Sequence, residues 1–398
     1  MCSTSAASSH SSERRWLDVG QADDRDSRLA GKRAADAALK GRSAALLIVF
    51  ASDSHDLEQL LESINERSAG APLIGCSTAG EIATDGPGDA GVVVTALGGD
   101  GFVVRTAVAE NASERLRAAG AEAASCMTAV DEHPHRALLM LSDGLAGNQQ
   151  EIVRGAYGVL GAEIPLVGGC AGDDLKMRRT YQLCDDRVLT NSVVAAGVAS
   201  DGPLGIGVRH GWRKVGDPIL VSESVNNLVY LLDEEPALDV YLDRLDAPAD
   251  VRSNPSAFTN FALTHPLGLD RRTDEEQVRF IAEADFERRA LVCIAEVPQG
   301  GIAWFMEGDE DSVLGATDAA CHDALAHLNG FPTLGMIAFD CIARRGVLGD
   351  AGIQREIAQI AGHANGAPVA GFYTYGEIAR THGVSGFHNQ TLVVLAVG

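Results

Sequence analysis

The stretch APLIGCSTAGEIA, residues 71–83, occurs again in altered form as APVAGFYTYGEIA, residues 367–379. In both copies a proline is followed three positions later by a glycine, and Gly-Glu-Ile-Ala closes the segment. The matched positions are Pro72 and Pro368, Gly75 and Gly371, Gly80 and Gly376, and Glu81 and Glu377. A chain that contains the same segment twice is predicted to be built by internal duplication.

Two weaker copies of the segment follow Pro165 and Pro332. Pro165 lies 93 residues after Pro72 (165 − 72) and opens PLVGGCAGDDL. After Pro332, Gly335 and the run Asp340-Cys341-Ile342-Ala343 stand at the same offsets. We interpret the four copies as one strand-turn unit that is distributed over two duplicated halves.

Each position of the unit has a physical reason. Proline favours an extended entry. The glycine at plus three lets a neighbouring backbone or a ligand approach the strand closely, and the glycine at plus eight can adopt a positive φ at a turn. Two alternatives remain for the acid at plus nine. Glu81 and Glu377 are either solvated carboxylates beside structural turns or equivalent acids that face a shared cleft and bind an amine or a hydroxyl.

Apolar runs alternate with segments of helical periodicity along most of the chain. AALLIVFAS (44–52) reads as a buried strand, and DLEQLLESI (56–64) follows with leucines at helical spacing. The same order returns at 136–160 and at 331–364. These patterns predict a mixed α/β fold of two duplicated halves, each a mixed β-sheet packed with helices.

The predicted division is a flexible polar leader at 1–41, an N-terminal domain at 42–235 and a C-terminal domain at 236–398. The leader is rich in Ser, Asp and Arg and has no sustained periodicity. It lacks the apolar core of a secretory signal. We therefore expect a cytoplasmic protein.

The charge balance excludes one class of partner and favours none. The 398 residues include 55 acidic and 32 basic ones, a formal charge of −23, so a phosphate backbone would be repelled and nucleic acid binding is not expected. No apolar run approaches the roughly 20 residues of a membrane helix, and no membrane association is expected.

The eight cysteines show no paired spacing of the zinc or disulfide kind. Cys341 alone stands close to a cation, Arg344, which would lower the pKa of its thiol; the alternative is a buried structural thiol. The segments HPH (133–135) and CHDALAH (321–327) lack the spacing of metal sites, and neither a phosphate-binding loop nor a GxSxG motif is present.

Five ordered motifs resemble the FIST proteins: LSDGLAGNQQEIVRGA, IPLVGGCAGDD, FDCIAR, YGEIAR and FHNQTLVVLAVG. The resemblance covers about residues 42–398. It implies paired N-terminal and C-terminal FIST domains that act as a sensory, ligand-binding module in signal transduction, with small molecules such as amino acids as ligands. Some stand-alone bacterial members are haem-binding nitric-oxide sensors that act on histidine kinases or cyclic-di-GMP enzymes, so haem is the cofactor that the resemblance allows.

The resemblance also implies which residues bind the ligand. They are Asp143, Gly169, Gly172 and Asp173 in the N-terminal half, and Cys341, Arg344, Tyr375, Gly376, Glu377, His388, Asn389 and Thr391 in the C-terminal half, with Glu81 added from the repeat. If haem is bound, His388 is the candidate axial ligand, and no other metal site is expected.

Three hypotheses follow. The first is a non-catalytic sensor that binds a small metabolite and signals to a partner protein. The second is a haem-based nitric-oxide sensor that regulates a histidine kinase or a cyclic-di-GMP enzyme. The third is an enzyme that uses Cys341 as a nucleophile.

Overall fold

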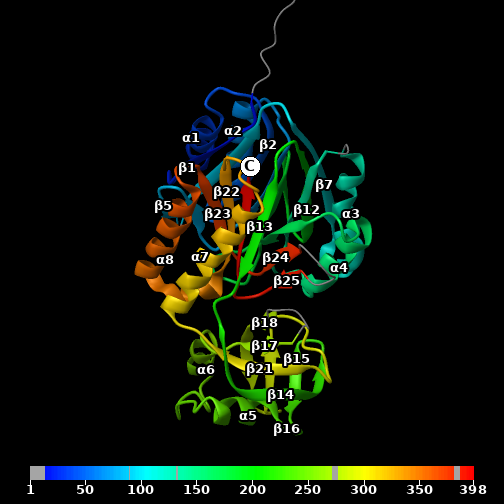
Figure 1. Cartoon of the computed structure of the whole chain (residues 1–398), viewed down its shortest axis with the longest axis vertical. Coiled ribbons are helices and arrows are strands. Elements are labelled where there is room, and N and C mark those ends of the chain that lie inside the picture. Colours follow the sequence, from blue (N-terminus) through cyan, green and yellow to red (C-terminus); the bar gives the residue numbers. More distant parts are fainter. Residues whose placement is uncertain (1–13, 89, 131–132, 271–276, 381–385) are drawn as a thin grey trace, which may run out of the picture.

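The computed structural model describes residues 14–88, 90–130, 133–270, 277–380 and 386–398. Within them, three six-stranded sheets surround a common core, and an eight-stranded antiparallel sheet forms a separate unit below them (Figure 1). The predicted mixed α/β class is confirmed.

The three six-stranded sheets are mixed. The first has the order β1 (Trp16–Ala22), β6 (Val92–Gly98), β2 (Ala44–Ala51), β3 (Leu73–Ser77), β10 (Gln182–Cys184) and β11 (Arg187–Leu189). The second has the order β25 (Phe387–His388), β24 (Glu377–Arg380), β9 (Leu166–Cys170), β8 (His135–Ser142), β12 (Ser192–Ser200) and β7 (Phe102–Glu110). The third has the order β13 (Leu204–Arg209), β26 (Leu392–Val397), β22 (Gly335–Cys341), β23 (Val369–Thr374), β4 (Glu81–Ala83) and β5 (Gly86–Gly88).

Each sheet contains one parallel pair joined by a helix. The pairs are β2–β3 across α2 (Leu57–Ser68), β8–β9 across α4 (Gln149–Leu160), and β22–β23 across α8 (Ile342–Ala364). A parallel pair needs such a crossover, and each helix buries its apolar stripe against its sheet. In α2 the stripe is the predicted one, Leu57, Leu60, Leu61 and Ile64.

The strand that follows each parallel pair leaves its own sheet and joins a neighbouring one. After β3 the chain forms β4 on the edge of β23; after β9 it forms β10 on the edge of β3; after β23 it forms β24 on the edge of β9. The exchange is cyclic: each of the three sheets donates one strand to a neighbouring sheet and receives one from the other. The two duplicated halves of the prediction are therefore three units, which follow Pro72, Pro165 and Pro368.

The copy at Pro332 is not one of these units. Pro332 precedes β22, the first strand of a parallel pair, whereas the other three prolines precede the second strand. Asp340 consequently lies inside β22 and not at a turn. The offsets match because glycine and aliphatic residues are common in buried strands.

The glycine at plus three permits the close contact of the parallel strands, as predicted. A Cβ at Gly75 would lie 2.3 Å from the carbonyl oxygen of Val49, and one at Gly371 would lie 2.1 Å from that of Ala338. At Gly168 the same distance, to the Met140 carbonyl, is 1.8 Å. The three glycines therefore set the spacing of the parallel pairs.

Gly371→Ala is expected to lower the free energy of unfolding by about 3 kcal/mol or more, because the new methyl group meets rigid backbone and forces the strands apart. The change can be measured by urea unfolding. Gly362→Ala is the control, since it adds a methyl group with no atom within 4 Å on the exposed side of α8. It should be neutral or stabilise by up to about 1 kcal/mol. Equal unfolding midpoints for the two variants would contradict the proposed role of the glycine.

The predicted leader is wrong from Trp16 onward. β1 is the edge strand of the first sheet, and α1 (Ser27–Leu39) buries Ala30, Ala34, Ala35 and Ala38. Asp26 accepts a hydrogen bond from the Leu29 amide and caps this helix. The Ala stripe has helical spacing but is interleaved with charged residues, which hid it. Residues 1–13 of the predicted leader lie outside the described residues.

Residues 213–307 form the separate lower unit, here called the inserted unit (Figure 1). Its strands and helices are β14 (Arg213–Val225), β15 (Leu228–Leu232), β16 (Glu235–Pro236), α5 (Ala237–Arg244), α6 (Pro255–Ala262), β17 (Leu267–Leu269), β18 (Gln277–Arg279), β19 (Ile281–Asp285), β20 (Ala290–Cys293) and β21 (Ile302–Glu307). It has its own core around Tyr241, Phe258 and Phe305. The boundary predicted between residues 235 and 236 falls inside this unit, within β16.

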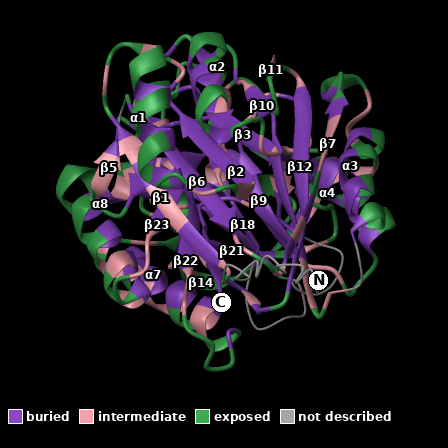
Figure 2. Ribbon diagram, turned by 90° about the horizontal axis from the view of Figure 1, so that it is seen from above, coloured by how far each residue is buried: buried purple, intermediate pink, exposed green. Residues whose placement is uncertain are grey.

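Helices cover the outer faces of the three sheets, and the inner faces meet in the middle (Figure 2). The helix pairs are α1 with α2, α3 (Leu116–Ala124) with α4, and α7 (Glu310–Ala326) with α8; two 3₁₀ turns, Ala112–Glu114 and Ser125–Ala129, flank α3. No helix in the described parts of the chain has both the length and the apolar character to cross a bilayer.

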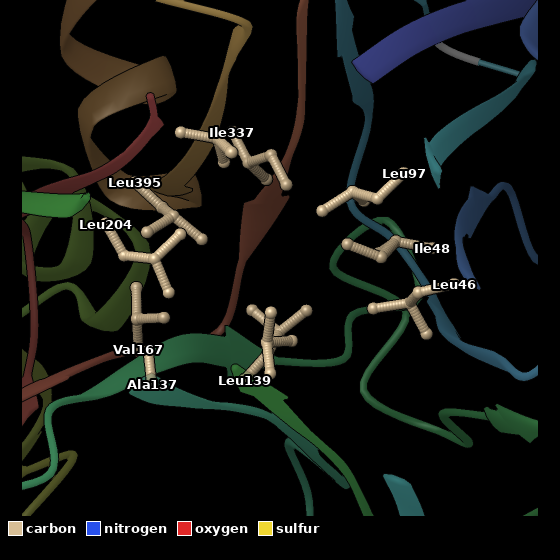
Figure 3. A pocket seen from close by; sticks show the side chains of 11 residues that line it. Leu46, Ile48, Leu97, Ala137, Leu139, Val167, Leu204, Ile337 and Leu395 are labelled. Atoms are coloured by element: carbon tan, nitrogen blue, oxygen red, sulfur yellow. The ribbon is translucent and has the colours of Figure 1, made fainter. Parts of the chain in front are cut away.

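A cavity of about 20 Å³ lies where the three inner faces meet (Figure 3). Ile48 comes from the first sheet, Leu139 from the second and Ile337 from the third, and their side chains point toward one another. The lining is apolar, so such a space stays dry. The polar groups that could form a site therefore lie at the strand ends and not at this centre.

Candidate functional site

Three backbone hydrogen bonds form a closed ring where the parallel strands end. The prolines that open the three units are Pro72, Pro165 and Pro368. In each bond the donor lies seven positions after one of these prolines, and the acceptor lies five positions after another. The Ala79 N–H donates to the Tyr373 carbonyl (3.0 Å), the Tyr375 N–H to the Cys170 carbonyl (3.2 Å), and the Gly172 N–H to the Ser77 carbonyl (3.0 Å). The ring locks the three units together at the point where their chains exchange sheets.

Glu81 and Glu377 occupy equivalent positions beside this ring, and both are fully buried. Glu81 accepts hydrogen bonds from the Thr78 hydroxyl (2.5 Å) and the Gly91 amide (3.0 Å). Glu377 accepts them from the Thr374 hydroxyl (2.5 Å) and the Thr391 amide. Each side chain thus ties its turn to the start of a later strand, β6 for Glu81 and β26 for Glu377.

The structure corrects the first alternative for these acids, because both side chains are fully buried and neither is solvated. Glu81 is on β4 of the third sheet, and Glu377 is on β24 of the second. The cyclic exchange puts them in different sheets although their sequences match. Thr391, a predicted ligand-binding residue, contributes its amide to this structural contact.

Gln182 is the third member of this set and was missed by the sequence analysis. It pairs with Cys76 in the register in which Glu81 pairs with Phe372 and Glu377 with Gly169. Its side-chain oxygen accepts from the Ser192 amide (3.1 Å), as Glu377 accepts from Thr391. No Gly-Glu-Ile run marks it, so only the strand register could have found it.

Burial controls the titration of Glu377 and Cys341. Desolvation raises the pKa of Glu377 to about 8, against the opposing hydrogen bonds from Thr374 and Thr391. Desolvation, with the nearby Glu377 carboxyl, raises the pKa of the Cys341 thiol well above its usual value. Of the two alternatives for Cys341, the lowering of its pKa by Arg344 is therefore wrong, and the buried structural thiol is the one that the structure supports.

Arg344 is bound inside a buried ionic cluster formed by Asp340, Arg344, Glu356 and Thr317. Its Nε donates to Asp340 (2.7 Å), and its Nη2 donates to Glu356 (2.6 Å) and to Thr317 (2.9 Å). All four residues are at most 1% exposed. Arg344 is consequently a structural cation and, contrary to the prediction, has no surface open to a ligand.

The two carboxylates of this cluster outnumber its one guanidinium. Desolvation, with Glu356 close by, raises the pKa of Asp340 well above its usual value. Asp340 Oδ2 and Glu356 Oε2 have no other partner in the described part of the chain. Burial and the neighbouring Glu356 therefore both favour the neutral form of Asp340.

The N-terminal motif residues shape the loop between β9 and β10. Asp143 accepts from the Leu145 amide, the Thr180 hydroxyl and the Asn191 amide, at 2.7–2.8 Å. Asp173 accepts from the amides of Met177, Arg178 and Arg179, and the Tyr375 hydroxyl donates to it as well. Asp173 and Tyr375 are both among the predicted ligand-binding residues, and the structure brings the two into contact with each other.

The motif glycines allow close packing. A Cβ would lie 2.8 Å from Thr374 Cγ2 at Gly169, 3.0 Å from the Ala79 nitrogen at Gly172, and 2.5 Å from the Phe387 ring at Gly376. Gly80 has the positive φ expected at plus eight, +118°, whereas Gly376 is not among the described glycines with positive φ. Glycine is therefore required at these two equivalent positions for different reasons: a positive φ at Gly80 and close packing at Gly376.

The segment 387–390 joins the three-sheet body to the inserted unit. The Gln277 side-chain amide donates to the Phe387 carbonyl (2.5 Å), the Gln390 side-chain amide donates to the Leu263 carbonyl (2.8 Å), and the Trp212 indole donates to the Gln390 carbonyl (3.0 Å). This contact region is called the junction below. Sequence analysis singled out His388, Asn389 and Thr391 in this motif but missed Gln390.

The junction contains buried acceptors without donors. Gln277 and Gln390 are 2% and 0% exposed, and their Oε1 atoms have no hydrogen-bond partner among the described residues. Asn389 Oδ1 is buried in the same way. The side-chain nitrogens of Gln277 and Gln390 each donate a hydrogen bond, which fixes the orientation of the two amides. The atoms without a partner are therefore the oxygens.

His388 does not fit the role of a haem ligand. Its Nε2 lies 3.0 Å from the Ala379 carbonyl, and β25 holds its backbone against Glu377. Iron ligation through Nε2 would break this hydrogen bond. No group of three His, Cys, Asp or Glu side chains suited to a metal ion occurs within the residues described.

Comparison with protein families agrees with the repeat and its motifs. Residues 45–235 match the FIST N domain, and residues 237–380 match the FIST C domain. The chain belongs to the FIST family. FIST domains are sensory domains of signal transduction. No curated protein matches the chain.

The two FIST models meet at residues 235 and 237, within the inserted unit and beside β16. This division in the sequence is not a division of the structure, because the third sheet of this FIST chain takes β4, β5 and β13 from the first model and β22 and β23 from the second. The two FIST domains are therefore interlocked.

Proposed function

We propose that this FIST chain is a non-catalytic cytoplasmic sensor that binds an amino acid or a related small metabolite at the junction. We further propose that it signals to a partner protein such as a histidine kinase or a cyclic-di-GMP enzyme. The observation that carries the proposal is the pair of buried amide oxygens of Gln277 and Gln390, which have no donor among the described residues. Unpaired buried acceptors are costly, and a ligand with an ammonium or hydroxyl group would supply the missing donors.

The connections of the inserted unit support a way to transmit binding. Two short links join the unit to the body, one between β13 and β14 and the other between β21 and α7. A ligand at the junction contacts both parts, so it favours the arrangement in which both contacts are made. A partner protein that binds this arrangement more tightly than the other would respond to the presence of the ligand.

A thermal melt against the amino acids and their amine and hydroxy-acid relatives tests the proposal. A ligand at a hundredfold excess over its dissociation constant contributes about 2.7 kcal/mol to stability, which raises the melting temperature measurably. Asn389→Ala should abolish the shift at little cost to the fold, because Asn389 Oδ1 has no partner in the described chain.

The control is Asn329→Ala, at an exposed position after α7. It should keep the full shift with the same ligand. A library in which no compound moves the melting temperature, or a shift that Asn389→Ala leaves intact, would contradict the proposed site. Haem added in the same assay should give no Soret band that depends on His388.

A further inference from the structure

The loop between β9 and β10 exposes a basic and apolar segment on an acidic protein. Residues 174–179, Asp-Leu-Lys-Met-Arg-Arg, are all exposed and contain three cations and one acid. Leu175 is 62% exposed and Met177 57%, the highest values among the large hydrophobic residues described. Single exposed apolar residues are ordinary, but two within a basic loop form a distinct surface.

The loop is held in a strained conformation. Asp174, Leu175 and Met177 have φ values of 54°, 59° and 51°, in the left-handed region that non-glycine residues avoid. Such strain persists only where the surroundings enforce it. Here they do: the buried Asp173 carboxylate accepts three amides of the loop, and the Leu175 amide donates to the Tyr375 hydroxyl (2.8 Å).

The three cations of the loop differ in whether they form ion pairs. Lys176 is paired with Asp53 at 2.7 Å, which anchors the loop to the end of β2. The side chains of Arg178 and Arg179 have no hydrogen bond or ion pair to any described residue. Two available guanidinium groups therefore lie beside two exposed apolar side chains.

We infer that residues 174–179 form a docking surface for a protein segment in which a large apolar side chain is flanked by Asp or Glu. Met and Arg are enriched in protein interfaces, and a preformed loop loses little entropy on binding. Charge decides the class of partner. An anionic membrane or a nucleic acid is an extended negative surface that would repel a protein of charge −23, whereas a short acidic segment meets only the local cations.

This surface shares no residue with the junction, and the inference stands whether or not a metabolite binds there. It is tested with a displayed library of random peptides, selected on the wild-type protein and counter-selected on the double variant Leu175→Ser/Met177→Ser. The expected peptides carry a large apolar residue flanked by acids. Their affinity should fall at least about tenfold on the double variant and several-fold on Arg178→Ser/Arg179→Ser.

Val225→Ser is the matched control, since Val225 is 56% exposed on the inserted unit and should leave peptide affinity unchanged. Tyr375→Phe tests the positioning role of the phenol: it should weaken the peptides and speed amide hydrogen exchange at residues 175–179. Three results would overturn the inference. They are equal binding to the double variant, loop-dependent binding to phosphatidylserine vesicles, and a loop-dependent dimer in sedimentation, which would assign the surface to a membrane or to a second copy.

Discussion

Arg344→Met is expected to lower the free energy of unfolding by about 3–5 kcal/mol, because it leaves two carboxyl groups buried without their cation. Arg344 and Asp340 are both 0% exposed, and Glu356 is 1% exposed, so water cannot replace the lost charge. Urea unfolding at neutral pH measures the loss. The effect should be larger than that of an apolar truncation on the same helix.

Two further variants separate this explanation from a general sensitivity of α8. Arg355→Met, on the same helix, removes an exposed ion pair to Glu310 (2.6 Å) and should cost less than about 1 kcal/mol. Combining Arg344→Met with Asp340→Asn and Glu356→Gln removes the uncompensated charges and should recover most of the loss. If the triple variant is no more stable than Arg344→Met, the cost does not come from buried charge.

Glu377→Gln is expected to gain stability over the wild type as the pH rises, by about 4 kcal/mol between pH 5 and pH 9. Burial raises the pKa of Glu377 to about 8 in the folded protein, whereas an unfolded glutamate titrates near its usual value. The folded state therefore binds more protons between these values. The stability that the protonated side chain contributes is complete at low pH and is lost as the pH rises toward 8 and beyond. A glutamine has no such loss.

The chain itself contains the precedent for this substitution. Gln182 occupies the equivalent place in another unit, with its oxygen on the Ser192 amide and its nitrogen near the Thr180 hydroxyl. The reciprocal change Gln182→Glu should make stability fall more steeply with rising pH. Denaturant unfolding across the pH range tests both variants, and a Glu377→Gln profile parallel to that of the wild type would falsify the assignment.

Local rules were enough to predict much of the fold. Proline and glycine at fixed spacing predicted the strands that follow Pro72, Pro165 and Pro368 and the close approach of a neighbouring backbone, because both depend on the backbone alone. The apolar stripe of α2 and the buried run of β2 were also readable, since a helix and a strand each impose their own period on burial. The FIST motifs likewise lie in contiguous stretches of sequence.

Long-range pairing decided the rest. Whether Glu81 lies in the first sheet or the third depends on which edge is free for β4 after β3 ends, and no nearby residue encodes that choice. The same exchange placed Gln182 in the position equivalent to those of Glu81 and Glu377, buried all three, and brought Gln277 and Gln390 to one junction. The sequence by itself determined the strand-turn unit through steric limits on φ and ψ. Only the tertiary structure decided that three units interlock, because a strand edge is completed by whichever backbone the packed core brings against it.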